Sequence, residues 1–169
     1  FGISLLPISI NYFSIFFDND LLLTANKLIP ITALITAIFI AVFFIILGFG
    51  YEGVAAGLGA SLSQSIYVRT SVGRVDTDLL NVGFFYLILG LILASIKVED
   101  KTNKLALICM AGFVNLLFSW WYQHPGFLIP FIFTLVLLQL FNRQKLSLSI
   151  IQIFLFMLFS GPFFVIDSF

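Results

Sequence analysis

The chain has 169 residues, of which 61% are apolar and 9% are charged, and its formal net charge is zero. A water-soluble domain of this length carries about a quarter charged residues, so the composition excludes an ordinary soluble fold and indicates a membrane protein. The lack of a basic excess excludes a nucleic-acid-binding protein, and the single cysteine, Cys109, provides neither an internal disulfide nor a metal cluster.

The first predicted element is an apolar stretch at residues 1–17, which is broken by Pro7, Asn11 and several serines. These interruptions favour a helix that lies at the membrane interface or re-enters it, with a tilted spanning helix as the alternative. Asp18 and Asp20 follow the stretch. Their spacing resembles a metal-binding pair, but a solvated turn and a helix start are the simpler interpretation.

The longer apolar segments predict an all-α, polytopic bundle of transmembrane helices, which forms one partial membrane domain over residues 1–169. A helix needs about 20 mostly apolar residues to cross the hydrocarbon core. About six segments approach this length: 29–49, 54–67, 79–96, 104–121, 127–141 and 146–166. The segment 54–67 is short and rich in small residues, so we expect it to pack inside the bundle. Because the chain begins at Phe1 without a leader segment and stops in apolar sequence, we expect it to be an internal part of a longer protein.

The connections between the segments predict which helix ends share a side of the membrane. A tight turn is expected at 50–53, and charged connections are expected at 97–103 and 142–145. With one crossing per helix, these lie on one side, and the connections at 67–78 and 121–126 lie on the other. The first side holds Lys97, Lys101, Lys104, Arg143 and Lys145, and the second holds Lys27, Arg69 and Arg74. Because basic residues are enriched in cytoplasmic loops, the second side is predicted to face the periplasm or the cell exterior.

The most polar interruption of the chain is the loop at residues 69–78. Asp76 and Asp78 alternate with Thr77, so an extended backbone would direct both carboxylates to one side. Adjacent carboxylates repel unless a cation lies between them, and their oxygen atoms suit Mg²⁺ or Mn²⁺. Such an ion would act as a Lewis acid on a phosphate leaving group, whose oxygens Arg69 and Arg74 would contact. The alternative is a structural loop in which Asp76 stabilises the start of the next helix.

A second polar cluster follows the segment 104–121, on the side predicted for the loop. It contains Trp120, Trp121, Tyr122 and His124. The aromatic residues are typical of interfacial anchors, and they would also line a groove for a lipid-linked substrate. His124 has no partner at the spacing of a metal site or a catalytic triad, which favours a histidine in a surface turn.

The two clusters resemble motifs in the catalytic subunit of oligosaccharyltransferase, especially its bacterial and archaeal single-subunit type. In that family a tyrosine-rich stretch precedes an Arg-Thr, a Ser-Gly and an Asp-Thr-Asp. This chain has Tyr67, then Arg69 and Thr70, then Ser71 and Gly73 with Val72 inserted between them, then Asp76, Thr77 and Asp78. Arg74 and Val75 stand where the family often has aromatic residues. Trp120, Trp121 and Tyr122 resemble the Trp-Trp-Tyr at the end of a later membrane helix.

The resemblance implies a C-type glycosyltransferase membrane domain that takes part in protein N-glycosylation. The enzyme would transfer an oligosaccharide from a lipid-pyrophosphate donor, a lipid-linked oligosaccharide, to Asn in polypeptides with Asn-x-Ser/Thr. It implies that Asp76 binds Mn²⁺ or Mg²⁺, that Asp78 supports the metal and that Arg69 pairs with these carboxylates. Tyr122 would approach the pyrophosphate. The family's first acidic motif and its Trp-Trp-Asp motif are not in this chain, so we expect the chain alone to transfer no sugar.

Other classes of membrane protein remain open. A different polyprenyl-phosphate-sugar glycosyltransferase, such as a protein O-mannosyltransferase, has its acidic pair in the first outer loop, whereas here at least two membrane segments precede the pair. A transporter or flippase would use Arg69 and Arg74 to hold an anionic substrate, but the inverted repeats typical of transporters are not found in the sequence. In a structural membrane subunit, Asp76 and Asp78 would contribute only to stability.

Overall fold

The computed structural model describes residues 5–61, 78–122 and 128–161 of the chain. The described residues form helices and no strand, which confirms the all-α prediction. In chain order the helices are α1 (Leu5–Ser14), the short 3₁₀ helix η1 (Ile15–Phe17), α2 (Leu21–Leu47), α3 (Gly50–Ser61), α5 (Asp78–Lys97), α6 (Lys101–Tyr122), α7 (Leu128–Phe141) and α8 (Leu146–Phe159).

Three of the described helices, α2, α5 and α6, are long and apolar enough to cross a membrane by length and composition, which indicates a membrane protein. The helices α7 and α8 are apolar but have 14 residues each. At 1.5 Å per residue each is about 21 Å long, whereas the hydrocarbon core of a bilayer is about 30 Å thick. The predicted segment 146–166 is not one helix, because α8 ends at Phe159 and Gly161 has a φ of 62°.

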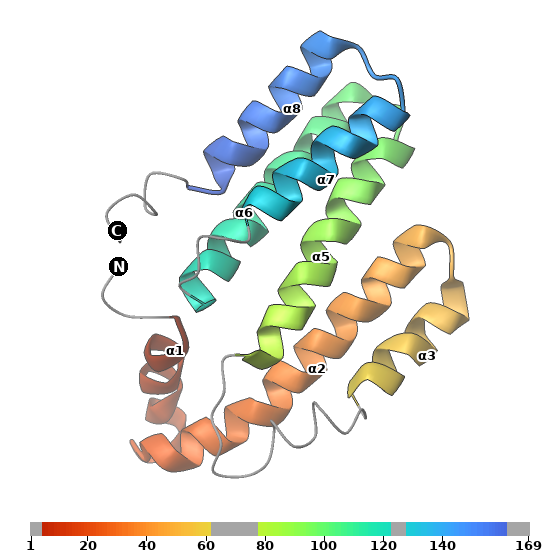
Figure 1. The fold of residues 1–169 in the computed structure, drawn as a ribbon. Helices are drawn as coiled ribbons and strands as arrows, with labels where there is room; N and C mark the ends of the chain where they lie inside the picture. Colours follow the sequence, from red (N-terminus) through yellow and green to blue (C-terminus); the bar gives the residue numbers. More distant parts are fainter. Residues whose placement is uncertain (1–4, 62–77, 123–127, 162–169) are drawn as a thin grey trace.

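The helices alternate in direction, and each packs against near neighbours in the chain (Figure 1). The helices α2, α5 and α7 run one way, and α3, α6 and α8 return. The largest helix interfaces join α2 to α5 and to α3, α5 to α6, and α6 to α8. The connections at 48–49, 98–100 and 142–145 therefore gather at one end of the bundle. The short α1 and η1 lie beside the N-terminal end of α2, at the opposite end of the bundle from these connections.

The helix α2 begins at Leu21, earlier than the predicted start at residue 29, because Asp20 caps it. The backbone N–H groups of Leu22 and Leu23 donate to Asp20 Oδ1 at 2.9 and 3.0 Å. These N–H groups have no partner within the helix, and a side-chain oxygen at this position satisfies them. The interpretation of Asp20 as part of a helix start is therefore confirmed.

The predicted tight turn at 50–53 is wrong, because the turn lies at Gly48 and α3 already begins at Gly50. Gly48 has a φ of 105°, and its N–H donates to the carbonyl of Ile45 at 3.0 Å. The N–H of Phe49 donates to the carbonyl of Phe44 at 3.0 Å. This pair of bonds is a Schellman motif, which glycine favours because the left-handed conformation brings a Cβ into a clash.

The helix α3 packs closely against α2 through two glycines. A Cβ at Gly57 would lie 2.5 Å from the carbonyl oxygen of Ala37 and 2.9 Å from the Cβ of Ala41. One at Gly53 would lie 3.1 Å from the Cβ of Phe44. For residues 54–61, the described part of the predicted segment 54–67, the expectation of a position inside the bundle is wrong, since α3 packs on the outer side of α2 and leaves Val54 and Leu58 exposed. Small residues provide the close approach, but only on the one face that meets α2.

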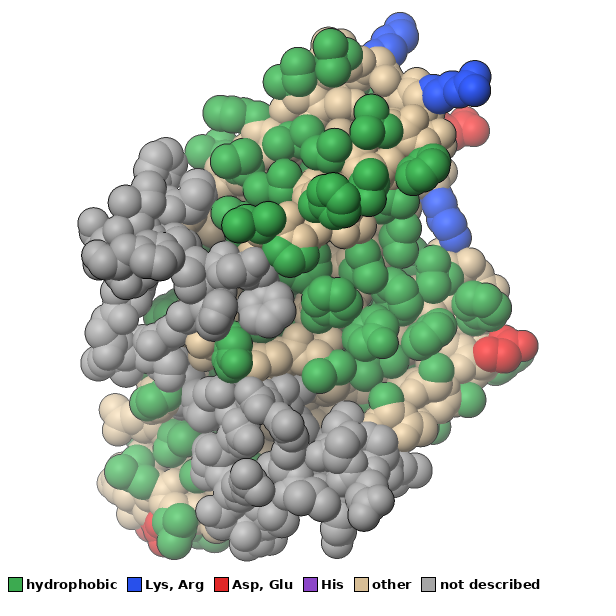
Figure 2. Space-filling model, in the orientation of Figure 1, with side chains coloured by type: hydrophobic (Ala, Val, Ile, Leu, Met, Phe, Trp, Pro, Cys, Tyr) green, Lys and Arg blue, Asp and Glu red, His purple; other side chains and the backbone are tan. Residues whose placement is uncertain are grey.

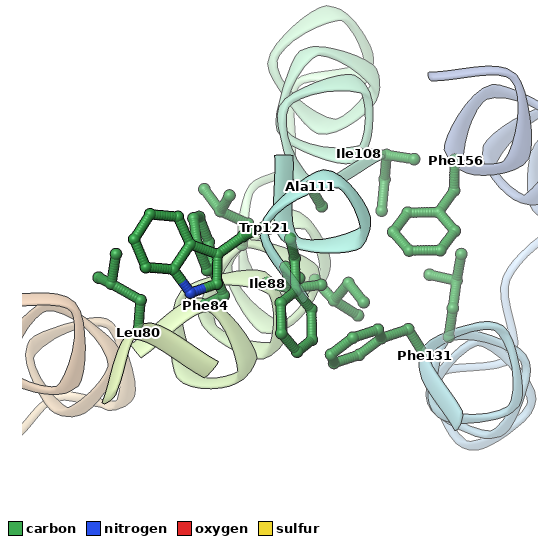
Figure 3. Close-up of a cluster of buried hydrophobic side chains, with 12 residues drawn as sticks. Leu80, Phe84, Ile88, Ile108, Ala111, Trp121, Phe131 and Phe156 are labelled. Carbon is green, nitrogen blue, oxygen red and sulfur yellow. The ribbon is translucent and has the colours of Figure 1, made fainter. Parts of the chain in front are cut away.

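The main apolar core lies between α5, α6, α7 and α8 (Figure 3). Phe84 of α5 stacks on Phe118 of α6, with their ring centroids 5.6 Å apart. Phe131 of α7 and Phe156 of α8 extend the core on the other side of α6, and both are fully buried. This core holds together the helix ends on which the predicted site depends.

A buried pair of amides joins α7 to α8. Gln139 Nε2 donates to Gln152 Oε1 at 2.9 Å, and both residues are at most 4% exposed. A hydrogen bond between polar side chains stabilises helix pairs in membranes, because an unpaired amide in an apolar setting is costly.

Replacing Gly57 by alanine is expected to lower the free energy of unfolding of the detergent-purified protein by about 1–3 kcal/mol, because the added Cβ meets the α2 backbone. Gly59 in the same helix is the matched control, since a Cβ there meets nothing within 4 Å. Gly59→Ala is expected to leave stability unchanged or raise it by up to about 1 kcal/mol through helix propensity. Equal thermal or denaturant unfolding of the two variants would contradict the packing of α3 on α2.

Replacing Gln139 by leucine is expected to lower the free energy of unfolding by about 1–3 kcal/mol, because Gln152 is left buried and unpaired. The double variant with Gln152→Leu is expected to recover part of this loss. A double-mutant cycle measured by unfolding in detergent should give a coupling energy of about 0.5–2 kcal/mol. A coupling energy of zero would mean that the two amides do not bond.

Candidate functional site

The residues predicted to form the site fall into a part that the structure describes and a part that it does not. Arg69, Arg74 and Asp76 lie outside the described residues, as does His124. Asp78 is the first residue of α5, so the structure describes its place in the fold. The aromatic residues at the end of α6 are described in full.

The structure brings the start of α5 and the end of α6 to the same end of the bundle (Figure 1). Close to this end, Trp121 lies beside Leu80 and Phe84 (Figure 3). All three side chains belong to the buried core between the helices. Because the helices are antiparallel, Asp78 in the first turn of α5 is level with the last turn of α6. The start of α5, where the first sequence cluster ends, and the end of α6, where the second begins, therefore lie at the same end of the bundle.

The aromatic residues at the end of α6 differ in their surroundings. Trp121 is 4% exposed and packs in the core, whereas Trp120 is 36% exposed. The ring of Tyr122 is half-buried and stacks on Phe118, with centroids 6.4 Å apart and an interplanar angle of 20°. Trp120 is therefore the residue placed to anchor the helix end at the membrane surface. The packing of Trp121 holds α6 against α5, and its role in binding a substrate stays a prediction.

The two ends of the bundle differ in charge. Most of the described basic residues lie in or beside the connections at the end away from Asp78: Lys97, Lys101, Lys104, Arg143 and Lys145. Figure 2 shows blue, basic side chains on the surface at this end. Lys97 Nζ donates to the carbonyl oxygen of Ile46 at 2.7 Å, so it ties the end of α5 to the last turn of α2. Near the foot of α2, the described charged residues include Asp18, Asp20 and Lys27.

The predicted metal site lies beyond what the described residues test. Within residues 5–61, 78–122 and 128–161, no group of three or more His, Cys, Asp and Glu residues is close enough to hold a metal ion. Asp76 is not among these residues, so the metal ligands predicted from the sequence stay a prediction.

One buried polar residue was not singled out from the sequence. Asn115 lies in the middle of α6 and is 1% exposed, and its Oδ1 has no hydrogen-bond partner among the described residues. Polar side chains within membrane helices are costly, and they often mark functional regions. The available signal was the presence of a single amide within an otherwise apolar part of the segment 104–121.

In comparisons with known proteins, no family model matches the chain, and no curated protein or solved structure is detectably similar to it.

Replacing Trp121 by alanine is expected to lower the free energy of unfolding by about 3–5 kcal/mol, because a large buried side chain is removed from the core. Trp120→Ala is the matched control and is expected to cost less than about 1 kcal/mol, since its indole is partly exposed. Unfolding in detergent measures both values. Quenching of the remaining tryptophan by acrylamide should be weak in the Trp120 variant and strong in the Trp121 variant. Equal stability losses and equal quenching would contradict the described end of α6.

Proposed function

We propose that this chain is part of the membrane domain of a multi-pass glycosyltransferase that resembles the oligosaccharyltransferase catalytic subunit. The enzyme would transfer an oligosaccharide from a lipid-pyrophosphate donor to Asn of Asn-x-Ser/Thr acceptors. The observation that supports the proposal is that the start of α5 and the end of α6 lie at the same end of the bundle. The residue Asp78 begins α5 there, and Trp121 and Tyr122 end α6 there.

The charge distribution supports an extracytoplasmic position for the loop at 69–78. The opposite end of the bundle carries Lys97, Lys101, Lys104, Arg143 and Lys145. Cytoplasmic loops are enriched in such residues, so this end of the bundle would face the cytoplasm. The loop would then lie at the periplasmic or outer surface, where a lipid-linked oligosaccharide and an unfolded acceptor chain meet.

The chain's own residues would contribute binding and charge to the reaction. Asp76 and Asp78 are hard oxygen donors, which suit Mn²⁺ or Mg²⁺, and such an ion supplies Lewis-acid stabilisation to a phosphate leaving group. Arg69 would pair with the carboxylates and hold them in position. Arg74 would contact phosphate oxygens, for which guanidinium geometry is well suited. Tyr122, at the end of α6, would approach the pyrophosphate of the donor.

Replacing Asp76 by asparagine in the full-length protein is expected to lower oligosaccharide transfer by at least about 100-fold, because the change removes a charged metal ligand. Transfer is measured with a fluorescent acceptor peptide and a lipid-linked oligosaccharide, over a series of Mn²⁺ concentrations. The control is Asp18→Asn, which makes the same chemical change in the exposed turn before α2, where asparagine tolerates the φ of 52°.

The control variant is expected to keep full transfer and an unchanged dependence on Mn²⁺. Normal transfer by the Asp76 variant would show that Asp76 is not a metal ligand. If the unsubstituted full-length protein transfers no sugar to any Asn-x-Ser/Thr peptide, the proposed function itself is wrong.

A further inference from the structure

The basic end of the bundle is formed by two connections that are distant in the sequence. Lys101 and Lys104 lie in the first turn of α6, and Arg143 and Lys145 lie in the turn between α7 and α8. All four are exposed or half-buried. These four residues are called the basic end below.

The packing of α6 on α8 brings these two connections to the same depth. The helices run in the same direction, and they touch at Gly112, where a Cβ would lie 2.7 Å from the carbonyl oxygen of Phe156. Gly112 is about 16 Å along α6 from Lys101, and Phe156 is about 15 Å along α8 from Leu146, at 1.5 Å per residue. The first turns of the two helices are therefore level, with the lysines on one and the arginine turn beside the other.

The neighbouring charges leave the basic end with an excess of positive charge. Lys97 donates a hydrogen bond to the carbonyl oxygen of Ile46, so it belongs to the contact between α2 and α5. The carboxylate of Asp100 accepts the N–H of Asn103 at 2.8 Å, so it caps α6. Glu99 is exposed in the connection before α6, and Glu52 lies in the first turn of α3.

Large apolar side chains flank the arginine turn directly. Phe141 is 84% exposed at the end of α7, and Leu146 is 75% exposed at the start of α8. Between them stand Arg143, whose φ of 47° turns the chain, and Lys145. A surface that changes within a few residues from exposed apolar groups to cations fits an amphipathic anion, with its phosphate at the cations and its chains along the apolar helices. A soluble anion would make no use of the apolar part.

We propose that the basic end binds the phosphate group of an anionic phospholipid, such as phosphatidylglycerol, between the first turn of α6 and the α7–α8 turn. The lipid's acyl chains would lie against the exposed apolar side of α7 and α8: Phe141, Leu146, Ile150 and Phe154. The bound lipid holds α6 and the α7–α8 turn together at this surface. This site is separate from the loop at 69–78, and it does not depend on the glycosyltransferase activity.

The test uses the full-length protein in a neutral detergent, with phosphatidylglycerol or phosphatidylcholine added. Native mass spectrometry measures how many lipids are retained, and thermal unfolding measures stabilisation. The unsubstituted protein is expected to retain phosphatidylglycerol in preference and to unfold at a higher temperature with it. The double variant Arg143→Gln with Lys145→Gln is expected to bind phosphatidylglycerol about fivefold more weakly for each charge removed.

Two matched variants separate a defined site from general attraction to positive charge. Lys27→Gln removes an exposed lysine near the other end of the bundle and is expected to leave phosphatidylglycerol binding unchanged. Arg143→Lys with Lys145→Arg keeps both charges and is expected to retain the lipid, which shows that the substituted turn still folds.

Three results would overturn the proposal. The first is unchanged binding of phosphatidylglycerol in the double glutamine variant, and the second is an equal loss of binding in the Lys27 variant. The third is stabilisation by inorganic phosphate equal to that by phosphatidylglycerol at the same concentration, because the site would then bind a soluble anion.

Discussion

Close backbone contact at a few glycines sets the arrangement of the described helices. Within lipid the hydrophobic effect does not drive helices together, so van der Waals packing at small residues contributes much of the free energy of helix association. A Cβ at Gly83 of α5 would lie 3.0 Å from the Cα of Thr36 in α2, and one at Gly112 of α6 would meet the backbone of Phe156. Each contact fixes how far one helix is shifted along its neighbour. The depths of the described helix ends follow from these contacts.

Polar side chains in the apolar interior divide into two kinds according to their reach. Short hydroxyls bond to their own helix, as Ser95 does to the carbonyl of Ile92 at 2.7 Å and Thr24 to that of Asp20 at 2.6 Å. Such residues need no partner helix and impose no arrangement. Amides are longer and need a partner elsewhere, which Gln139 finds in Gln152. The amide pair therefore specifies which faces of α7 and α8 meet, whereas the buried hydroxyls are compatible with many packings.

The helices bounded by charges could be predicted from the sequence. The segments 79–96 and 104–121 differ from α5 and α6 by a few residues at most, because Asp78 and Lys97 bound α5, while Lys101 and Lys104 mark the start of α6. The start of α2 was missed, since Asn26 and Lys27 interrupt the apolar pattern while the cap at Asp20 extends the helix past them. With one membrane crossing for each predicted helix, the sequence also predicts that the start of α5 and the end of α6 lie on the same side. The burial of Trp121 beside an exposed Trp120 could not be predicted, because it depends on where α5 packs on α6.

The unequal helix lengths have a consequence for the support of the aromatic end of α6. The helix α6 has 22 residues and is about 33 Å long, whereas α8 beside it has 14 and is about 21 Å long. The two helices start at the same depth, so the C-terminal end of α8 lies about 12 Å short of the level that the C-terminal end of α6 reaches. The last two turns of α6 therefore extend past the described end of α8, and there Phe118 and Trp121 pack with Phe84 of α5. A change in α8 would then disturb the middle of α6 more than its aromatic end, whereas a change in the first turns of α5 would reach that end directly.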